Sequence, residues 1–243
     1  MKRKMGVSVA LLLALAALTV MTGCRWVKFP TFTETTSIPL RGATTVTAQI
    51  QQSVGELTLR ASAVPTDGVQ ADFTYAPEDW KPDVVTSSEA SSASFRISSP
   101  ASDGRSWFGY MRNTWVITMP TGVKTDLGLD LGVGTSTVDL RGIDVASLSV
   151  RTGVGETSID LSGTRTHNVT VRVQAGVGNL TLRLPRTISV KVTTPEKGVG
   201  NLSAPGFIQN GDLLINGEFL VAGPTIDIEL VRGVGNVTLE LTD

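Results

Sequence analysis

Two residues of this chain could perform covalent chemistry, the only cysteine and the only histidine. Cys24 and His167 together would make a nucleophile and its general base, the pair that cleaves esters and amides. Cys24, however, is part of the N-terminal motif described below, which gives it another role. His167 has no partner residue at the spacing of metal ligands. We therefore expect His167 to be a loop residue and expect no catalytic pair.

The acidic residues follow no metal-binding pattern. They lack the Gly-Gly-x-Gly-x-Asp repeat of calcium-binding β-rolls and the loop of an EF-hand. The scattered acids considered for a metal site are Asp126, Asp130, Asp139, Asp144 and Asp160. Glycine pairs could suggest phosphate loops, but no Gly-Lys-Ser or Gly-Lys-Thr follows them. Serine is abundant, yet no serine lies in a nucleophile-elbow sequence. The sequence thus predicts no enzyme, no metal site and no cofactor.

The first 23 residues have the features of an export signal. A basic stretch at residues 2–4 precedes an apolar run over residues 7–20, which is too short for a comfortable membrane span. The segment ends in Met-Thr-Gly-Cys24, which resembles the lipobox of bacterial lipoproteins. In that family the signal is cut before the cysteine, the sulfur is diacylated and the new amine is often acylated too. An ordinary secretory signal with an incidental cysteine is the alternative.

The resemblance to a lipobox implies a mature chain that begins at Cys24 and is held on a bilayer by its acyl chains, on the extracytoplasmic side of the cell membrane. Residues 24–40 contain Pro30, Pro39 and several threonines, and we expect them to form a tether. The formal net charge is −1, and loss of the three basic residues at 2–4 makes it −4. This charge gives no electrostatic case for nucleic acid as a partner.

A short phrase, Gly-Val-Gly, recurs through the rest of the chain. It begins at residues 132, 153, 176, 198 and 233, and Ser53-Val54-Gly55 is a degenerate first copy. The first four full copies are 21, 23 and 22 residues apart. Repeats of this length are typical of stacked units, none of which can bury its apolar face alone.

Apolar residues alternate on both sides of each Gly-Val-Gly, as in strands with one buried face. Leu129 and Leu131 are in phase with Val133, whereas Val138 and Leu140 follow in the opposite phase. In a flat strand this slip would turn the apolar side chains to solvent. We therefore predict a bulge or corner at each glycine pair, which keeps both halves of the strand facing one core.

One unit is then a strand, a glycine corner, a second strand and a turn. These units predict an all-β, stacked-coil β-solenoid, with an antiparallel β-sandwich as the alternative. The solenoid repeats occupy residues 131–243, and residues 41–130 form an N-terminal region. Within residues 207–215, Asn210-Gly211 between apolar runs predicts an inserted hairpin that could cover an end or a side of the solenoid.

The segment 75–115 holds most of the aromatic residues of the mature chain. One interpretation is a cap that seals the N-terminal end of the solenoid. The other is an extracytoplasmic platform that binds a glycan or a lipid, and its candidate residues are Trp107, Tyr110 and Trp115.

With these features the chain resembles the toast-rack domains of bacterial envelope proteins, among them the LiaF-like proteins of the cell-wall stress response. The resemblance covers residues 45–243 and is carried by Ser53–Leu59, Glu78–Val84, Asn113–Ile117 and the later Gly-Val-Gly-Asn copies. It implies a non-enzymatic β-solenoid at the cell envelope, acting as a scaffold or as an interaction module for an unidentified envelope protein. LiaF-like proteins have membrane-spanning helices ahead of this domain, where this chain has its lipobox-like segment. The family brings no catalytic residues.

Overall fold

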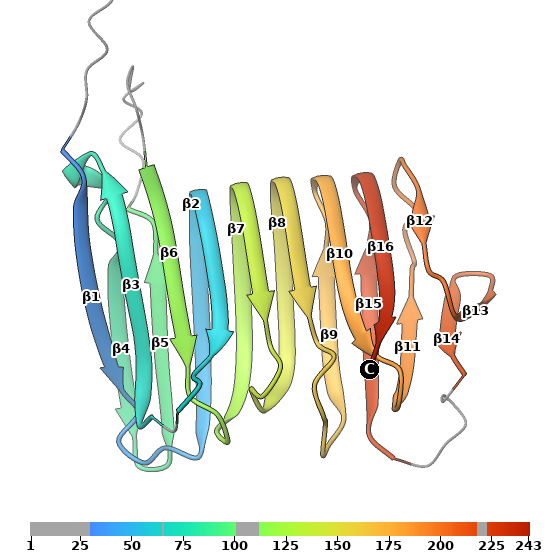
Figure 1. Ribbon diagram of the computed structural model, residues 1–243, viewed down its shortest axis with the longest axis horizontal. Helices are drawn as coiled ribbons and strands as arrows, with labels where there is room; N and C mark the ends of the chain where they lie inside the picture. The colour runs from blue at the N-terminus through green and yellow to red at the C-terminus, as the bar shows by residue number, and fades with distance from the viewer. Residues whose placement is uncertain (1–29, 65, 101–111, 218–222) are drawn as a thin grey trace, which may run out of the picture.

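The computed structural model describes residues 30–64, 66–100, 112–217 and 223–243. In this part of the chain, strands and turns dominate and the only helix is a short 3-10 turn, η1 (Glu78–Trp80). Sixteen strands form one mixed sheet that folds over into two layers (Figure 1). They are β1 (Phe32–Pro39), β2 (Thr45–Ala61), β3 (Gly68–Ala76), β4 (Asp83–Glu89), β5 (Ser92–Ser98), β6 (Arg112–Met119), β7 (Lys124–Asp139), β8 (Val145–Asp160), β9 (Val169–Gln174), β10 (Val177–Pro185), β11 (Ser189–Thr193), β12 (Leu202–Ser203), β13 (Phe207–Asn210), β14 (Leu213–Asn216), β15 (Thr225–Val231) and β16 (Val234–Thr242).

The glycine corners connect the two layers of the sheet. β2, β7 and β8 are 17, 16 and 16 residues long, and each runs through its corner from one layer into the other. Later copies break at the corner into two strands, as β9 and β10 do, or β15 and β16. Each half of a coil forms a parallel strand pair with the corresponding half of the adjacent coil. The predicted all-β solenoid of stacked coils is therefore confirmed.

The hydrophobic core lies between the two layers. Leu129 and Leu131 before the second corner are buried, and so are Val138 and Leu140 after it, as the change of phase predicts. The valine of the corner itself is in phase with the buried residues before it, but Val133 is 51% exposed. Its side chain lies at the apex of the corner, outside the buried residues on either side.

The spatial order of the coils differs from their order in the chain. The last coil, β15 and β16, pairs on one side with β9 and β10 and on the other with β11 and β12. It is therefore inserted between two coils that precede it in the sequence. At the other end, β2 similarly lies between β7 and the later strands β5 and β6. The number of residues between successive Gly-Val-Gly copies reveals the repeat, but it does not reveal that the last coil is inserted between earlier ones.

The hairpin predicted around Asn210-Gly211 is present. β13 and β14 are antiparallel, and β14 pairs with β11, so that β13 is the last strand at this end of the sheet. Gly211 has a φ of +62°, which suits a tight hairpin turn. The hairpin therefore covers an edge that β11 would otherwise leave open.

The N-terminal elements extend the same sheet. The predicted tether of residues 24–40 becomes strand from Phe32 onward, because β1 pairs with β3 along its whole length. Residues 1–23 and Cys24 lie outside the described residues. The predicted boundary between residues 130 and 131 falls within β7. Among the described residues, none of the helices has the length and apolar character needed to cross a membrane.

Candidate functional site

Among the described residues, those that could bind a metal ion are not clustered. Across the described ranges, no cluster of three or more His, Cys, Asp or Glu residues could hold a metal ion. His167 lies in the turn after β8, where Nε2 is 2.6 Å from Asp144 Oδ1 and Nδ1 is 2.9 Å from the carbonyl oxygen of Asn168. The hydrogen bond to Asn168 and then the one to Asp144 raise the pKa of His167. This histidine links two successive turns.

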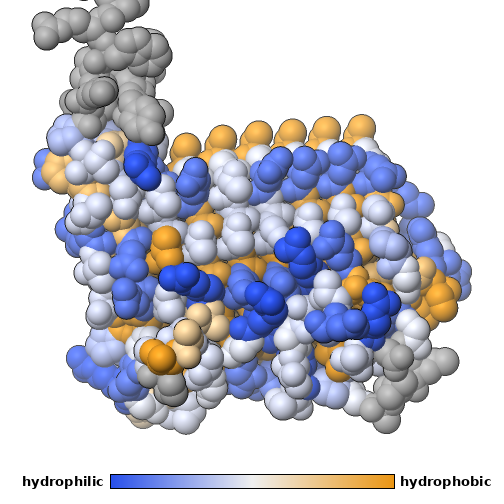
Figure 2. All heavy atoms as spheres, in the orientation of Figure 1, coloured by the Kyte–Doolittle hydropathy of each residue, from blue (hydrophilic) through white to orange (hydrophobic). Residues whose placement is uncertain are grey.

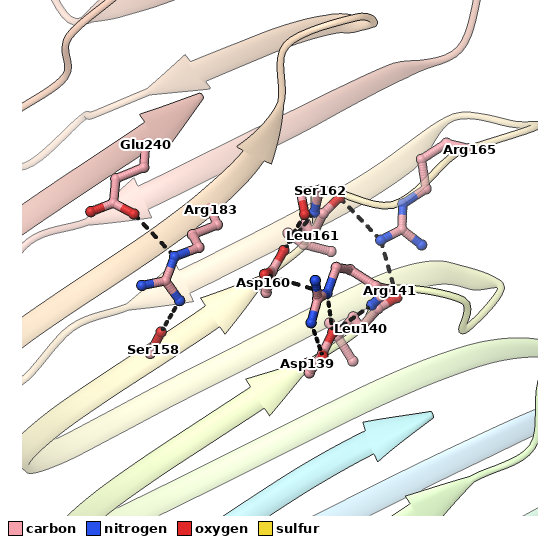
Figure 3. Close-up of polar contacts among 10 residues, drawn as sticks. All are labelled: Asp139, Leu140, Arg141, Ser158, Asp160, Leu161, Ser162, Arg165, Arg183 and Glu240. Atoms are coloured by element: carbon pink, nitrogen blue, oxygen red, sulfur yellow. Dashed lines mark hydrogen bonds and ion pairs between the residues drawn. The ribbon is translucent and has the colours of Figure 1, made fainter. Parts of the chain in front are cut away.

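Several aspartates of β7 and β8 accept contacts from cations or hydroxyl groups. Arg141 Nη2 is 2.7 Å from Asp139 Oδ2, and its Nε is 3.6 Å from Asp160 Oδ2 (Figure 3). The guanidinium holds the pKa of Asp139 below its usual range. Asp126 accepts a hydrogen bond from the Ser147 hydroxyl. These carboxylates therefore join neighbouring coils.

Arg165 is a buried cation that the sequence did not single out. Arg165 is 7% exposed, and its guanidinium donates to the carbonyl oxygen of Ile143 at 2.8 Å. It also donates to the carbonyl oxygens of Leu140 and Leu161 at 3.3 and 3.2 Å (Figure 3). Burial lowers the pKa of its guanidinium. Because these carbonyls belong to the turns after β7 and β8, Arg165 fixes the two turns together. No sequence motif marks it, since an arginine in a threonine-rich turn is ordinarily exposed.

The aromatic region contributes to the core in its described part. Trp115 is 0% exposed, and its ring meets Phe73 edge-on with centroids 5.6 Å apart. Its Nε1 donates to Asn113 Oδ1 at 2.6 Å, and Asn113 Nδ2 donates to the carbonyl oxygen of Val54 at 2.6 Å. Tyr75 is also buried and stacks on Phe32. Trp115 is therefore unable to offer its face to a ligand in this structure, and the other two platform candidates, Trp107 and Tyr110, lie outside the described residues.

Four hollows of the described surface have no acid–base pair in their lining. Two hollows of about 240 and 370 Å³ lie beside β1 at the turn edge, and each is lined by one charged residue, Arg41 in the first and Asp67 in the second. The cavities at the glycine corners have volumes of only about 10 Å³, roughly the space of one water molecule. A general acid–base reaction needs two groups converging on one bound substrate, and these hollows do not supply them.

The most regular surface feature is a line of exposed valines at the corners, which we call the valine ridge. Successive members are neighbours in register, and Figure 2 shows the resulting row of hydrophobic residues along the upper edge of the molecule. They are 40–69% exposed and comprise, in spatial order, Val54, Val133, Val154, Val177, Val234 and Val199. The repeated Gly-Val-Gly phrase locates the ridge in the sequence. The alternation of apolar residues, however, puts each valine in phase with buried residues, and the prediction that the valines are buried is wrong.

The ridge is held straight by the glycines beside its valines, which lie on both sides of every valine except Val54. A Cβ atom on Gly132 would lie 1.9 Å from the carbonyl oxygen of Ser53, and one on Gly153 would lie 2.4 Å from that of Gly132. Real Cβ atoms do not approach so closely, so only glycine lets successive corners stack. The valine ridge is therefore a rigid apolar line, and we take it as the candidate functional site.

Comparison with known proteins gives one family and several structures. The family model described as the N-terminal domain of toast_rack, DUF2154, matches residues 28–183. The crystal structure of a candidate cell adhesion protein from Clostridium sporogenes is 29% identical, with a TM-score of 0.83, and the match covers 88% of this chain and 100% of that one. A candidate adhesin from Bacteroides fragilis is 15% identical, with a TM-score of 0.35, over 86% and 97% of the two chains. No curated protein matches the sequence.

Proposed function

Because the chain belongs to the toast-rack family, whose N-terminal domain spans residues 28–183, we propose that it is a non-enzymatic interaction module of the bacterial cell envelope. The solenoid acts as a rigid scaffold, and lipid on Cys24 holds it to the extracytoplasmic face of the cell membrane. The likeness to the candidate cell adhesion protein from Clostridium sporogenes supports a role in binding rather than in catalysis.

The observation that carries this proposal is the regularity of the outer surfaces. In the layer that contains β10 and β16, hydroxyl side chains occupy one register row across neighbouring strands, which we call the hydroxyl row. It consists of Thr58, Thr137, Ser158, Thr181, Thr238 and Ser203, all partly or fully exposed. A flat array of hydrogen-bonding groups suits an extended macromolecular partner better than a small substrate, which needs a concave site.

Charged side chains border this row. Arg183 Nε is 3.0 Å from Glu240 Oε2, and Arg183 Nη1 donates to the Ser158 hydroxyl at 3.2 Å (Figure 3). These contacts order side chains across β8, β10 and β16 before any partner arrives. A surface ordered in advance loses less conformational entropy on binding. The partner we propose is another envelope protein, and the family resemblance makes the cell-wall stress response its first candidate setting.

Photo-crosslinking in living cells tests the proposal. A photoreactive amino acid replaces Thr137 or Thr181 in the hydroxyl row, and a matched control replaces Thr121, an exposed residue in the turn between β6 and β7. We expect both hydroxyl-row positions to capture the same envelope protein in the membrane fraction and the control to capture none of it. Equal capture from all three positions, or no capture at any, would contradict the proposed interaction face.

A further inference from the structure

The first strand begins at the edge of the molecule that carries the valine ridge. Phe32 pairs with Tyr75, Tyr75 pairs with Asn113, and Asn113 lies against Gly55, the residue after Val54. The start of β1 is thus in the same register row as the glycine corners. Figure 1 shows the chain entering β1 at the upper end, and Figure 2 shows the ridge on that same edge.

The chain ahead of β1 is too short to move the lipid anchor far from this edge. Five residues, 25–29, lie between Cys24 and Pro30, where the described part begins, so the two Cα atoms are six residue steps apart. Fully extended, this segment spans about 20 Å. From β1 to β2 there are three strand spacings, about 14 Å in all, since strands are about 4.8 Å apart. A bilayer that holds Cys24 is therefore within reach of the ridge, whereas the turns lie at the opposite edge.

We propose that the valine ridge rests on the lipid bilayer, with its valines at the boundary between headgroups and acyl chains. This inference rests on the proposed lipid anchor at Cys24. The solenoid then stands on its ridge, with both sheet faces roughly perpendicular to the membrane and the turns furthest from it. The hydroxyl row remains free for a partner, because the bilayer contacts only the corners.

The character of the ridge fits a lipid surface. Its half-exposed side chains are apolar and form one straight line, the arrangement that a flat apolar boundary can meet at every residue. Burial of apolar area drives interfacial binding, and a lipid anchor already holds the protein at the surface, so that a weak contact suffices. Contiguous exposed apolar surface on a protein marks sites that contact other proteins or membranes.

Charges beside the ridge are mixed in sign. Glu56, Asp130, Arg151 and Glu156 lie near the first three corners, whereas Lys197 and Arg232 lie near the far end. Because positive charges do not outnumber negative charges near the ridge, electrostatic attraction to anionic lipids does not account for its contact with the bilayer. The contact should therefore form on zwitterionic lipid and should persist at high salt.

Fluorescence quenching on liposomes tests the inference. The lipidated full-length mature protein is reconstituted into phosphatidylcholine liposomes after Val154→Cys or Val177→Cys is labelled with an environment-sensitive dye. Thr121→Cys, at the turn edge, is the matched control. Acylated Cys24 has no free thiol, so the dye reports one position only. We expect the ridge labels to shift to the blue and to be quenched several-fold more by lipids spin-labelled near the headgroup than the control label, in both low and high salt.

The outcomes separate this inference from the proposed anchor. A protein that stays on the liposomes while its ridge labels remain in water retains the anchor and overturns the ridge contact. The ridge labels could also shift to the blue only as more protein is bound per liposome, with no quenching by the spin-labelled lipid. That result would mean that a second copy of the protein covers the ridge, and it also overturns the inference. A mature protein that carries no lipid and leaves the liposomes overturns both.

Discussion

Gly134 stacks on Gly55 so closely that a Cβ atom at residue 134 would be 1.8 Å from the carbonyl oxygen of Gly55. The same relationship repeats between Gly155 and Gly134 and between Gly178 and Gly155, each at 1.9 Å. The second glycine of each phrase also has a φ between +131° and +146°, a conformation that is essentially restricted to glycine. The conspicuous repeat thus serves the approach of one backbone to the next, and leaves the valine between the glycines free for the surface.

Replacing Gly155 with alanine should strongly destabilise the fold. The new methyl group would collide with the backbone of Gly134, and residue 155 would keep a φ of +138° that alanine avoids. We expect the free energy of unfolding to fall by about 3 kcal/mol or more in a thermal or urea denaturation. Gly217→Ala is the matched control, because nothing lies within 4 Å of a Cβ there. Equal, small effects of both changes would refute the stacking account.

Removing the Trp115 side chain should destabilise the protein as loss of a core residue does. Trp115→Ala deletes a fully buried ring and leaves Asn113 without one of its partners. We expect a loss of about 3–5 kcal/mol in urea denaturation. Thr114→Ala, at the preceding residue on the outer face of β6, should cost far less. Unchanged stability of Trp115→Ala would show that the ring is not part of the core and would restore it as a platform candidate.

Substitution of Arg165 should loosen the turns after β7 and β8. Arg165→Leu keeps bulk but removes the donors to three carbonyl oxygens, of Leu140, Ile143 and Leu161. We expect a loss of about 1–3 kcal/mol, together with faster amide hydrogen exchange in both turns. Arg141→Ala removes an exposed cation from the same region and should cost less than about 1 kcal/mol. If the two variants behave alike, Arg165 does not fix the turns.

His167 should make stability depend on pH. Its pKa is raised from 6.5 by hydrogen bonds to Asn168 and Asp144, so the folded protein binds the proton more tightly than the unfolded chain does. This stabilisation is fully present below about pH 6.5 and is lost as the pH rises through the higher folded pKa. We expect the melting temperature of the wild type to fall over this range relative to His167→Gln. Parallel pH profiles for the two proteins would contradict the assignment.

The sequence predicts features that depend on neighbouring residues. The change of apolar phase across Gly132 to Gly134 locates the corner, and Asn210-Gly211 locates the hairpin, because strand alternation and turn geometry are local. The same alternation fails at Val133, where the chain turns and the side chain at the apex is exposed. The proline and threonine content that predicts a tether over residues 24–40 does not show that the stretch from Phe32 pairs as a strand with β3.

Features that depend on distant contacts could not be read from the sequence. The insertion of β15 and β16 between earlier coils follows from a choice of strand partners among nearly identical repeats. The role of Arg165 depends on three carbonyl groups that are brought together only when the turns stack. Trp115 could equally be a cap residue or a platform residue by composition, and its burial between β3 and β2 decides for the core.

The central claim is that Cys24 anchors the solenoid at the cell membrane. Its most direct test is fractionation of cells that express the wild type or Cys24→Ala, with mass spectrometry of the N-terminal peptide. We predict that the wild type is in the membrane fraction with two or three acyl chains on a peptide that begins at Cys24, and that Cys24→Ala keeps its signal sequence or is released. A Cys24→Ala protein that stays membrane-bound at the size of the processed chain would contradict the account.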